Sequence, residues 1–552
     1  MTAFRREIAA SISRALALAL CFVAAAFALR PSVAQEAAGK SSSGPTFDIL
    51  EFRVEGNTVL PAREIERAIS PFLGEKRHFA DVEAARKALE DAYQKAGYQS
   101  VFIEIPEQRV VAGVIRLHVL EGRVGQTRVT GSKYYELGEI REGVPQFAPG
   151  SVPNFLEVQQ EMASLNKQPD RQVSPILTAG KVPGTIDVNL SVRDELPLHG
   201  DIEDDNHASP FTTSDRASAS LHYDNLWQLQ HSIALNYQVA PTDPAQTNVL
   251  YGTYLWRFAG RDDAVSVYGI RSNSDVAVVG SSTILGNAKI AGARWIHPLG
   301  TGQSEGASYF NSLTLGIDRK DFAQTNVSAI TYNITVLPPI TYYPISASYG
   351  ATLVGEKGTT QFSFGAVTAP RDLFGNTDEK FRSRRVLGDA GYMAWKPSIS
   401  ADHWLAQHWS VYGMLDGQWT NDPLIPNEQY LTGGSQSVRG YKESEVSGDR
   451  GAHATLELRH YPVGRPSPDG KRLLYTEVFV DGAQVRLIAP QGPQISVSTI
   501  ASTGLGVHAL GWRGLHCDVD LAWALRDGGH GAQGPITSNG TFHVEASLGY
   551  SF

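Results

Sequence analysis

The sequence contains very little cysteine and no long apolar segment outside its first 34 residues. Cys21 lies in that first segment, so the mature chain keeps only Cys517 and cannot form an intramolecular disulfide. After the leader, no run of about 18 apolar residues occurs, which excludes a membrane-spanning helix in the mature chain. Strands of a membrane β-barrel alternate apolar and polar residues, so that type of membrane protein stays possible.

Clustered positive charge and enzyme motifs are also missing. The chain has 48 basic and 57 acidic residues spread along its length, so nothing indicates a nucleic-acid-binding face. No G-x-S-x-G motif occurs, and His403 and His408 lack the acidic neighbours of a metal site. The G-x-G-x-x-A run at Gly504–Ala509 has no surrounding βαβ unit, so we interpret its glycines as part of a barrel wall. We therefore predict no enzymatic activity, no cofactor, no metal and no nucleic-acid partner.

The N-terminus has the pattern of an export signal. Arg5, Arg6 and Arg14 precede and flank the apolar run from Ala15 to Leu29, and Ser32-Val33-Ala34 resembles a cleavage site. We predict a signal peptide over 1–34 and a short Gly/Ser/Lys linker over 35–45. This signal predicts export, and together with the barrel-like region described below it predicts a protein of a bacterial envelope.

Residues 46–121 are predicted to form a small α+β domain. Leu50, Phe52 and Val54 alternate as in a strand, and Pro61 is placed to begin a helix that ends near Ile69. A second helix follows, whose apolar positions share one face and which Gly97 ends: Val82, Ala85, Leu89, Ala92 and Ala96. Strands over 101–105 and 112–120 complete the order strand, two helices, two strands.

A similar unit is predicted over 122–195. It begins with a strand over 125–130, and its main helix carries Phe155, Val158, Met162 and Leu165 on one side. Strands over 171–178 and 185–192 end the unit. Two unrelated α+β domains would give the same pattern, so periodicity alone does not identify their purpose.

From residue 196 to the C-terminus the helical period is replaced by alternation. In the last strand, one face carries Val544, Ala546, Leu548, Tyr550 and Phe552, and the other carries Glu545, Ser547, Gly549 and Ser551. Aromatic residues recur where the interfaces of a membrane barrel would lie, at Tyr254, Trp256, Phe258, Trp419 and Trp523. A soluble β-sandwich has the same alternation, but the export signal favours a barrel. About sixteen strands fit, at roughly ten residues per strand plus turns.

Two short motifs in this region carry a resemblance. Val438-Arg439-Gly440-Tyr441 resembles the VRGY motif of the two-partner secretion (type Vb) outer-membrane transporters, the hemolysin activation/secretion family. Phe479, Asp481 and Gly482 resemble that family's F-x-D-x-G wall motif, except that Ala483 replaces the final glycine. Residues 46–121 and 122–195 resemble its POTRA domains. The C-terminal Tyr550 and Phe552 resemble the signal read by the outer-membrane assembly machinery.

The resemblance implies a mainly β fold, in which two POTRA-like domains precede a transmembrane antiparallel β-barrel over 196–552. It implies that Arg439 sits in the barrel lumen, where a lone cation requires a carboxylate such as Asp481. The expected function is capture of an unfolded exported partner with an N-terminal secretion domain, followed by secretion through the barrel. An outer-membrane location in contact with lipid, POTRA-like domains in the periplasm and a monomeric state are expected.

Three other functions remain open at this point. An outer-membrane protein assembly factor of the same superfamily has a similar barrel and VRGY loop, but such factors usually carry more than two POTRA domains. A passive porin would explain the barrel and leave both α+β domains unexplained. An outer-membrane hydrolase would need a nucleophile–base pair, which the sequence does not display.

Overall fold

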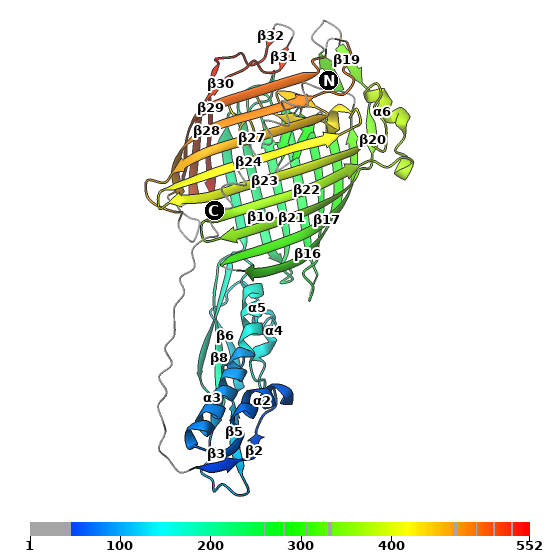
Figure 1. Cartoon of the computed structure of the whole chain (residues 1–552). Helices are drawn as coiled ribbons and strands as arrows, with labels where there is room; N and C mark the ends of the chain where they lie inside the picture. The colour runs from blue at the N-terminus through cyan, green and yellow to red at the C-terminus, as the bar shows by residue number, and fades with distance from the viewer. Residues whose placement is uncertain are drawn as a thin grey trace, which may run out of the picture. The chain divides into compact units, whose positions relative to one another are not determined.

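The computed structural model describes residues 46–552 except 259, 275, 280–281, 286, 305, 324, 329–333, 467–472, 493, 512–513 and 532–533. The predicted signal peptide and linker lie outside the described residues. The chain forms two compact units (Figure 1). Of the described residues, one contains those up to Arg128 with Val144–Ala163 and Ile176–Asn189, and the other contains Val129–Gly143, Ser164–Pro175 and Leu190–Phe552. None of the helices in the described residues is both long and apolar enough to cross a membrane.

The first α+β segment has the predicted order with three additions, β1 (Phe47–Ile49), η1 (Ser70–Phe72) and β3 (Gly74–Arg77). In chain order its elements are β1, β2 (Glu51–Glu55), α2 (Ala62–Ile69), η1, β3, α3 (Phe79–Lys95), β4 (Val101–Glu104) and β5 (Val114–Glu121). Strand β2 runs parallel to β5, and β4 runs antiparallel to it. Pro61 is the residue before α2 and not its first residue, and the small β1–β3 pair was not predicted.

The face of α3 that packs on the sheet is the predicted one. Leu89 and Tyr93 are fully buried with Leu117 of β5, and Ala92 and Ala96 pack against the same cluster. Gly97 follows the helix with a φ of 99°, a conformation that ends helices and favours glycine.

The second α+β segment repeats the arrangement. Its elements are β6 (Arg123–Thr130), α4 (Leu137–Glu142), η2 (Pro145–Phe147), α5 (Phe155–Leu165), β7 (Arg171–Ala179) and β8 (Thr185–Asp194). The sheet order is β6-β8-β7. Val158, Met162 and Leu165 of α5 are buried, as their spacing predicts.

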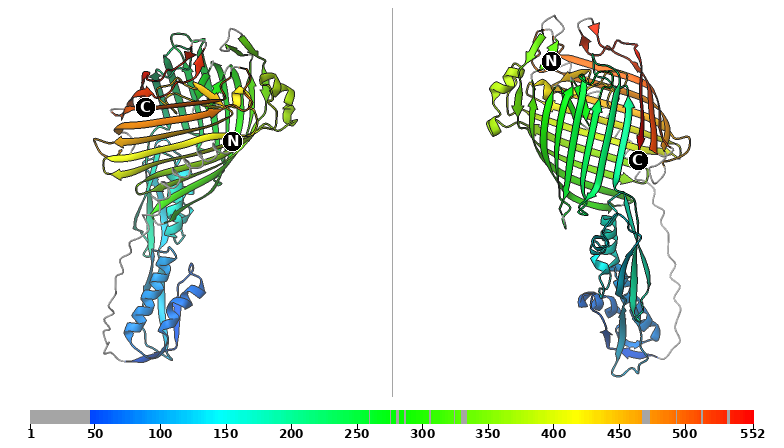
Figure 2. Two further views of the ribbon diagram at one scale, coloured as in Figure 1. Left: turned by 45° about the horizontal axis from the view of Figure 1, so that its top comes forward. Right: turned by 180° about the vertical axis from the view of Figure 1, so that it is seen from behind.

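The C-terminal region is a closed antiparallel barrel of sixteen strands (Figures 1 and 2). In chain order they are β9 (Leu198–Asp205), β10 (Arg216–Leu226), β11 (His231–Val239), β12 (Thr247–Arg257), β13 (Ala264–Ser274), β16 (Ala288–Ser304), β17 (Ala307–Phe322), β20 (Ile340–Tyr342) with β21 (Ile345–Gly355), β22 (Gly358–Thr368), β23 (Met393–Ala406), β24 (Trp409–Thr420), β27 (Arg450–His460), β28 (Leu473–Arg486), β29 (Val497–Leu510), β30 (Leu515–Ala524) and β33 (Phe542–Ser551). Segments β20 and β21 occupy one strand position, because both pair with β17. The predicted fold class and strand number are confirmed.

The barrel strands alternate between a lumen face and an outer face. In β28, Phe479 and Asp481 are buried, whereas Val478 and Val480 are 51% and 54% exposed. In β33, Leu548 and Tyr550 are likewise exposed, as is Phe552 directly after the strand, and Glu545 and Ser547 are buried. Cys517 shares its strand face with the exposed Leu515 and Trp523. An apolar outer face with every strand paired is the arrangement that lipid requires.

The two ends of the barrel differ. At one end the connections are short, such as those between β16 and β17 and between β23 and β24. At the other end the connections are long and contain additional elements: β14 (Val276–Val279), β15 (Ser282–Leu285), β18 (Thr325–Ser328), β19 (Ile334–Leu337), η3 (Leu373–Gly375), α6 (Asp378–Arg384), η4 (Pro426–Glu428), β25 (Tyr430–Thr432), β26 (Val446–Gly448), β31 (His530–Gly531) and β32 (Gly534–Pro535). Short turns on one side and long loops on the other are typical of outer-membrane barrels.

The last strand closes the barrel by pairing with the first. Strand β33 is antiparallel to β9, with Tyr550 opposite Ile202. Beyond the strand, the amide of Phe552 donates to the Gly200 carbonyl at 2.9 Å, and the Gly200 amide donates to the Phe552 carbonyl at 3.1 Å. A Cβ on Gly200 would lie 2.3 Å from the Phe552 ring, so the ring packs directly on that glycine. The terminal residue therefore takes part in closure.

We expect deletion of Phe552 to lower the fraction of chains that form a closed barrel. The deletion removes two backbone hydrogen bonds at the closing seam, worth about 1–3 kcal/mol together, and the aromatic group at the strand end. The measurement is the heat-modifiable fraction of the protein in outer membranes. Phe542→Ala is the matched control, because it removes an exposed aromatic from the other end of β33 without touching the seam. An unchanged fraction after the deletion would show that Tyr550 alone is sufficient.

Candidate functional site in the barrel lumen

The predicted motif lies on the long connection between β24 and β27. Within this connection, β25 and β26 pair as a hairpin, with Thr432 opposite Val446. We call the intervening residues 433–445 the lumen loop, because their side chains and amides contact the inward-facing residues of β27, β28 and β33 described below. The loop begins with Gly433 and Gly434 and contains Gly440, and all three have φ near 90–110°.

The glycines at the start of the loop allow it to close on itself. A Cβ on Gly434 would lie 2.2 Å from the Glu443 carboxyl carbon, and one on Gly433 would lie 2.8 Å from the Lys442 carbonyl oxygen. The Glu443 carboxylate accepts hydrogen bonds from the Ser435 amide at 2.8 Å and the Ser435 hydroxyl at 3.0 Å. Such spacing leaves no room for a side chain, so the Gly-Gly pair is a structural requirement of the loop.

Arg439 is the most strongly bound residue of the lumen loop. Its Nε donates to Asp481 Oδ2 at 2.8 Å and its Nη2 to Asp481 Oδ1 at 3.0 Å, a two-point contact with one carboxylate. Its Nη1 donates to Glu477 Oε1 at 2.5 Å, and its Nη2 also donates to Glu457 Oε1 at 2.8 Å. Its backbone amide donates to Asp481 as well, at 3.2 Å. The guanidinium is therefore bound by three carboxylates from two strands, β27 and β28.

These charges are removed from bulk water. Arg439 is 5% exposed, and Asp481, Glu477 and Glu457 are 1%, 4% and 6% exposed. A buried guanidinium needs opposite charge and hydrogen-bond acceptors for its five N–H groups, and the three carboxylates supply both. Arg459 of β27 adds a second cation, since its Nη2 lies 2.5 Å from Glu457.

An aromatic ring supports the guanidinium from one side. The Arg439 guanidinium carbon lies 3.5 Å from the centroid of the Phe479 ring, within the range of a cation–π contact. Gly504 of β29 provides the space for this ring, because a Cβ there would lie 2.4 Å from it. Gly506 likewise provides space for Glu477 and Asp520, at 2.8 and 2.3 Å. The glycines of the G-x-G-x-x-A run thus belong to the barrel wall, as predicted, and shape this site.

The residues around Arg439 attach the loop at further points. The Gly440 amide donates to Glu545 of β33 at 2.7 Å. The Tyr441 hydroxyl oxygen lies 2.9 Å from the Ala501 carbonyl and 2.8 Å from the Arg526 carbonyl, which share its single proton. The Glu445 carboxylate accepts hydrogen bonds from Gly529 and Thr537, in the connection between β30 and β33.

An apolar cluster completes the contact between loop and wall. Val438, Tyr441 and Val446 are buried together with Ala483, Val485, Ile500 and Ala524 of the wall strands. Ala483 stands where the related motif has glycine, and the loop packs against its neighbourhood with the alanine in place. The departure noted in the sequence therefore does not keep the loop away from the wall.

The structure brings together six of the nine predicted site residues: Val438, Arg439, Gly440, Tyr441, Phe479 and Asp481. Gly482 is not among them, because alternation places it on the outer face of β28, and a Cβ there would meet only the Ile500 carbonyl at 3.9 Å. Tyr550 and Phe552 lie on the exposed outer face at the closing seam.

Three carboxylates that bind the lumen loop were not predicted from the sequence: Glu457, Glu477 and Glu545. Each occupies a polar position of an alternating strand, and Glu477 precedes Phe479 and Asp481 with the same parity. The alternation of the wall strands could therefore have indicated these three carboxylates. Alternation identifies which acids face the lumen, but it does not show which of those acids contact the loop.

Several inward-facing groups are close enough to share a metal ion. In the described part of the chain they are His199 with His222 and Asp224, Asp201 with Glu203 and His516, and Glu477 with His508 and Asp520. The last group lies next to Arg439, and its members already have charged protein partners. His508 Nδ1 lies 2.8 Å from Asp518, and Glu477 binds Arg439. We assign no metal to these groups.

Comparison with known proteins gives consistent results. Residues 47–122 match the POTRA domain, ShlB-type, and residues 184–509 match the haemolysin secretion/activation protein ShlB/FhaC/HecB. The outer membrane transporter CdiB of Dickeya dadantii is 24% identical over 437 residues, covering 76% of this chain and 74% of the relative. The heme/hemopexin transporter protein HuxB of Haemophilus influenzae is 20% identical over 444 residues, covering 76% and 72%.

A solved structure agrees with the fold described above. CdiB from Escherichia coli superposes with a TM-score of 0.66 at 17% sequence identity, over 94% of this chain and 93% of that chain. At this identity the likeness concerns the fold alone.

We expect Arg439→Ala to keep the barrel assembled but release the lumen loop. The change leaves three carboxylates without their shared cation, and breaking a fully buried pair costs about 3–5 kcal/mol, less in a wet lumen. Asp481→Asn should have a smaller effect, because Glu457 and Glu477 still bind the guanidinium. Arg439→Lys should restore little, since an ammonium cannot bind a carboxylate at two points. Single-channel conductance in planar bilayers is the measurement.

Arg294→Ala is the matched control for this series. Arg294 also binds a lumen carboxylate at two points, Asp318 at 2.6 and 2.8 Å, and stacks on Tyr268, but it lies on β16 and does not contact the loop. Its conductance should resemble that of the unchanged protein. The Arg439→Ala/Asp481→Asn double variant should be no worse than Arg439→Ala. Additive losses in the double variant would mean that Arg439 and Asp481 act independently.

We also expect Gly440→Ala to displace the loop. Gly440 has a φ of 87°, and an added Cβ would lie 3.0 Å from Ala522 Cβ on the wall. Gly464→Ala is the control for strain outside the loop, because Gly464 has a φ of 90° in the connection between β27 and β28, with no atom within 4 Å of an added Cβ. If displacement of the loop causes the effect, only Gly440→Ala changes conductance. Equal changes in both variants would mean that general destabilisation by backbone strain, about 1–2 kcal/mol, causes the effect.

Proposed function

Since this chain belongs to the haemolysin secretion/activation family of two-partner secretion transporters in the bacterial outer membrane, we propose that it captures an unfolded, exported partner protein in the periplasm and secretes it through its barrel to the cell surface. The barrel spans the outer membrane, and the POTRA domains are periplasmic, as in the rest of the family. Secretion is the family's role; unfolded capture by these domains is the proposal.

One observation supports the proposal most strongly: Arg439 binds the lumen loop to the carboxylates of the barrel wall. Side-chain contacts attach the loop to the wall, and the paired strands β25 and β26 hold its two ends together. It can therefore leave the wall without any strand of the barrel changing its pairing. When Arg439 withdraws, Asp481, Glu457 and Glu477 become available to water and to a passing chain. A loop held in this way suits a channel that is closed at rest and opens for its substrate.

The periplasmic domains offer the right chemistry for an unfolded partner. In the sheet β2-β5-β4, the outer strands β2 and β4 each have one neighbour within the sheet. An extended peptide can add to such an edge through backbone hydrogen bonds, which do not depend on its sequence. We propose that the partner's N-terminal secretion domain binds in this extended form.

The free energy of transport is proposed to come from the partner itself. The sequence contains no nucleotide-binding motif of recognisable context, and folding of the partner outside the cell would remove extended chain from the channel. Binding steps that are favoured only on the outer side give direction to the movement. Translocation into liposomes that required added nucleotide would contradict this part of the proposal.

We expect removal of Thr46–Asp194 to leave an assembled barrel that secretes nothing. The barrel strands and the lumen-loop contacts lie after Asp194, so heat-modifiable mobility should be kept. Partner protein in the culture medium is the measurement, and Arg294→Ala in the full chain is the control for a change that leaves the periplasmic domains intact. Secretion by the barrel alone would contradict the role of these domains. Loss of other outer-membrane proteins in the same strain would favour the assembly-factor alternative.

A further inference from the structure

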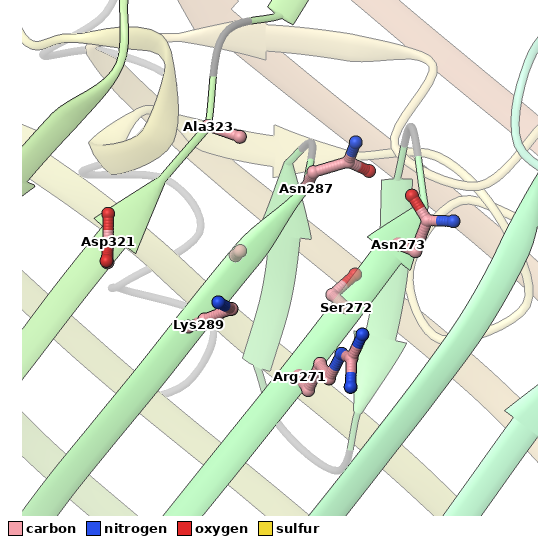
Figure 3. Close-up of a pocket in the computed structure, with 8 residues that line it drawn as sticks. Arg271, Ser272, Asn273, Asn287, Lys289, Asp321 and Ala323 are labelled. Carbon is pink, nitrogen blue, oxygen red and sulfur yellow. The ribbon is translucent and has the colours of Figure 1, made fainter.

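A group of charged residues lies on the outer face of the barrel, near the long-loop ends of β13, β16 and β17 (Figure 3). We call this group the rim cluster; it consists of Arg271, Lys289 and Asp321, which Figure 3 labels, and of Arg319, which is not among the residues drawn there. Arg271 lies directly opposite Lys289 across the β13–β16 pair, and Lys289 lies opposite Asp321 across the β16–β17 pair. Arg319 is two residues from Asp321 on the same strand face.

Strand alternation shows that these side chains point away from the lumen. Ile270 and Ile290, their neighbours along the strands, are buried in the inner apolar cluster, so Arg271 and Lys289 face outward. The same outer face is apolar farther from the loops, where Val267, Leu315 and Ile317 are 51%, 40% and 39% exposed. The change from apolar to charged side chains marks the outer boundary of the membrane, where an outward charge is tolerated.

The charges of the rim cluster do not balance. Asp321 is the only acid among three cations, and it binds Arg319 at 3.1 Å and accepts from the Thr341 hydroxyl at 3.1 Å. Neither Arg271 nor Lys289 makes an ion pair with any residue in the described part of the chain. Two cations directly opposite each other on neighbouring strands repel, so the pair destabilises the sheet unless an anion lies between them.

A pocket of about 410 Å³ opens beside these two cations. Arg271 and Lys289 line it together with Asn273, Asn287 and Asp321 (Figure 3). The guanidinium, the ammonium and the two amides can all donate hydrogen bonds to an oxyanion. The pocket thus combines two unpaired cations and two neutral donors with one carboxylate, Asp321, whose charge is already paired with Arg319, at the level of the lipid head groups.

We propose that this pocket binds a phosphate group on the head group of a phosphorylated glycolipid in the outer leaflet. The apolar strand surface next to it would contact the acyl chains of the same molecule. Anionic lipids are attracted to clustered basic residues at membrane interfaces, and arginine suits phosphate because it can bind two oxygens at once. The inference depends on the outer-membrane location of the chain and not on the proposed mechanism of secretion.

Native mass spectrometry of the full-length chain in detergent micelles tests the proposal. Lipid A with two phosphates is the probe, and dephosphorylated lipid A and inorganic phosphate are the comparisons. We expect the phosphorylated lipid to bind best, and Arg271→Gln with Lys289→Gln to weaken its binding about a hundredfold, the loss expected for two charge-assisted contacts at about tenfold each. Arg261→Gln with Lys357→Gln is the matched control, because it removes the same charge from the short-turn end of the barrel and should change nothing.

A second variant separates loss of binding from loss of folding. Arg271→Glu places a carboxylate opposite Lys289, so it should keep or raise the thermal stability of the barrel while abolishing lipid binding. Equal binding by the unchanged chain and both rim variants would overturn the proposal. Binding of inorganic phosphate as tight as that of the lipid, or equal binding of the dephosphorylated lipid, would overturn it as well.

Discussion

A buried guanidinium is the constraint on which the site depends. Arg439 is removed from water inside the barrel, and an uncompensated charge in that position would oppose folding of the loop. Three carboxylates, one aromatic ring and two glycines are placed on the wall strands to satisfy this one group. Residues that appear unrelated in the sequence, such as Phe479 and Gly504, are related through the space that the arginine and its supporting ring occupy.

The site forms only when the wall strands pair in one particular register. Glu457 lies opposite Phe479, and Phe479 lies opposite Gly504, so the site extends across three consecutive strands at one level. A shift of one residue in β28 would turn Glu477, Phe479 and Asp481 toward lipid and bring Val478 and Val480 into the lumen. Closure of β33 on β9 keeps every strand paired. The position of the carboxylates is therefore a property of the closed barrel.

The sequence predicted the fold well because alternation and helical spacing are local signals. The buried face of α3, the outer face of β33 and the contact between Arg439 and Asp481 could all be expected from spacing or motif. The short β1 and β3 strands could not, since their pairing depends on residues far apart in the chain. Gly482 was assigned to the site on resemblance, although alternation already placed it on the opposite face from Asp481. Where the motif and the alternation of the strand disagree, the alternation shows which residues face the lumen.

Glu457 and Glu477 show the limit of the same reasoning. Parity places both in the lumen, as it places many other polar residues, but only the three-dimensional path of the loop selects the two that meet Arg439. Several carboxylates around one guanidinium also set electrostatic attraction against the cost of desolvation. Each contact is strong in a low-dielectric site, yet desolvation of the four groups opposes it, so the net stabilisation is a small difference between large terms. Water that enters the lumen restores the solvation of all four groups at once, and the contact then loses most of its net stabilising free energy. An arrangement of this kind fixes the position of the loop with high specificity while keeping the free energy of release low, which a purely apolar contact of the same area would not do.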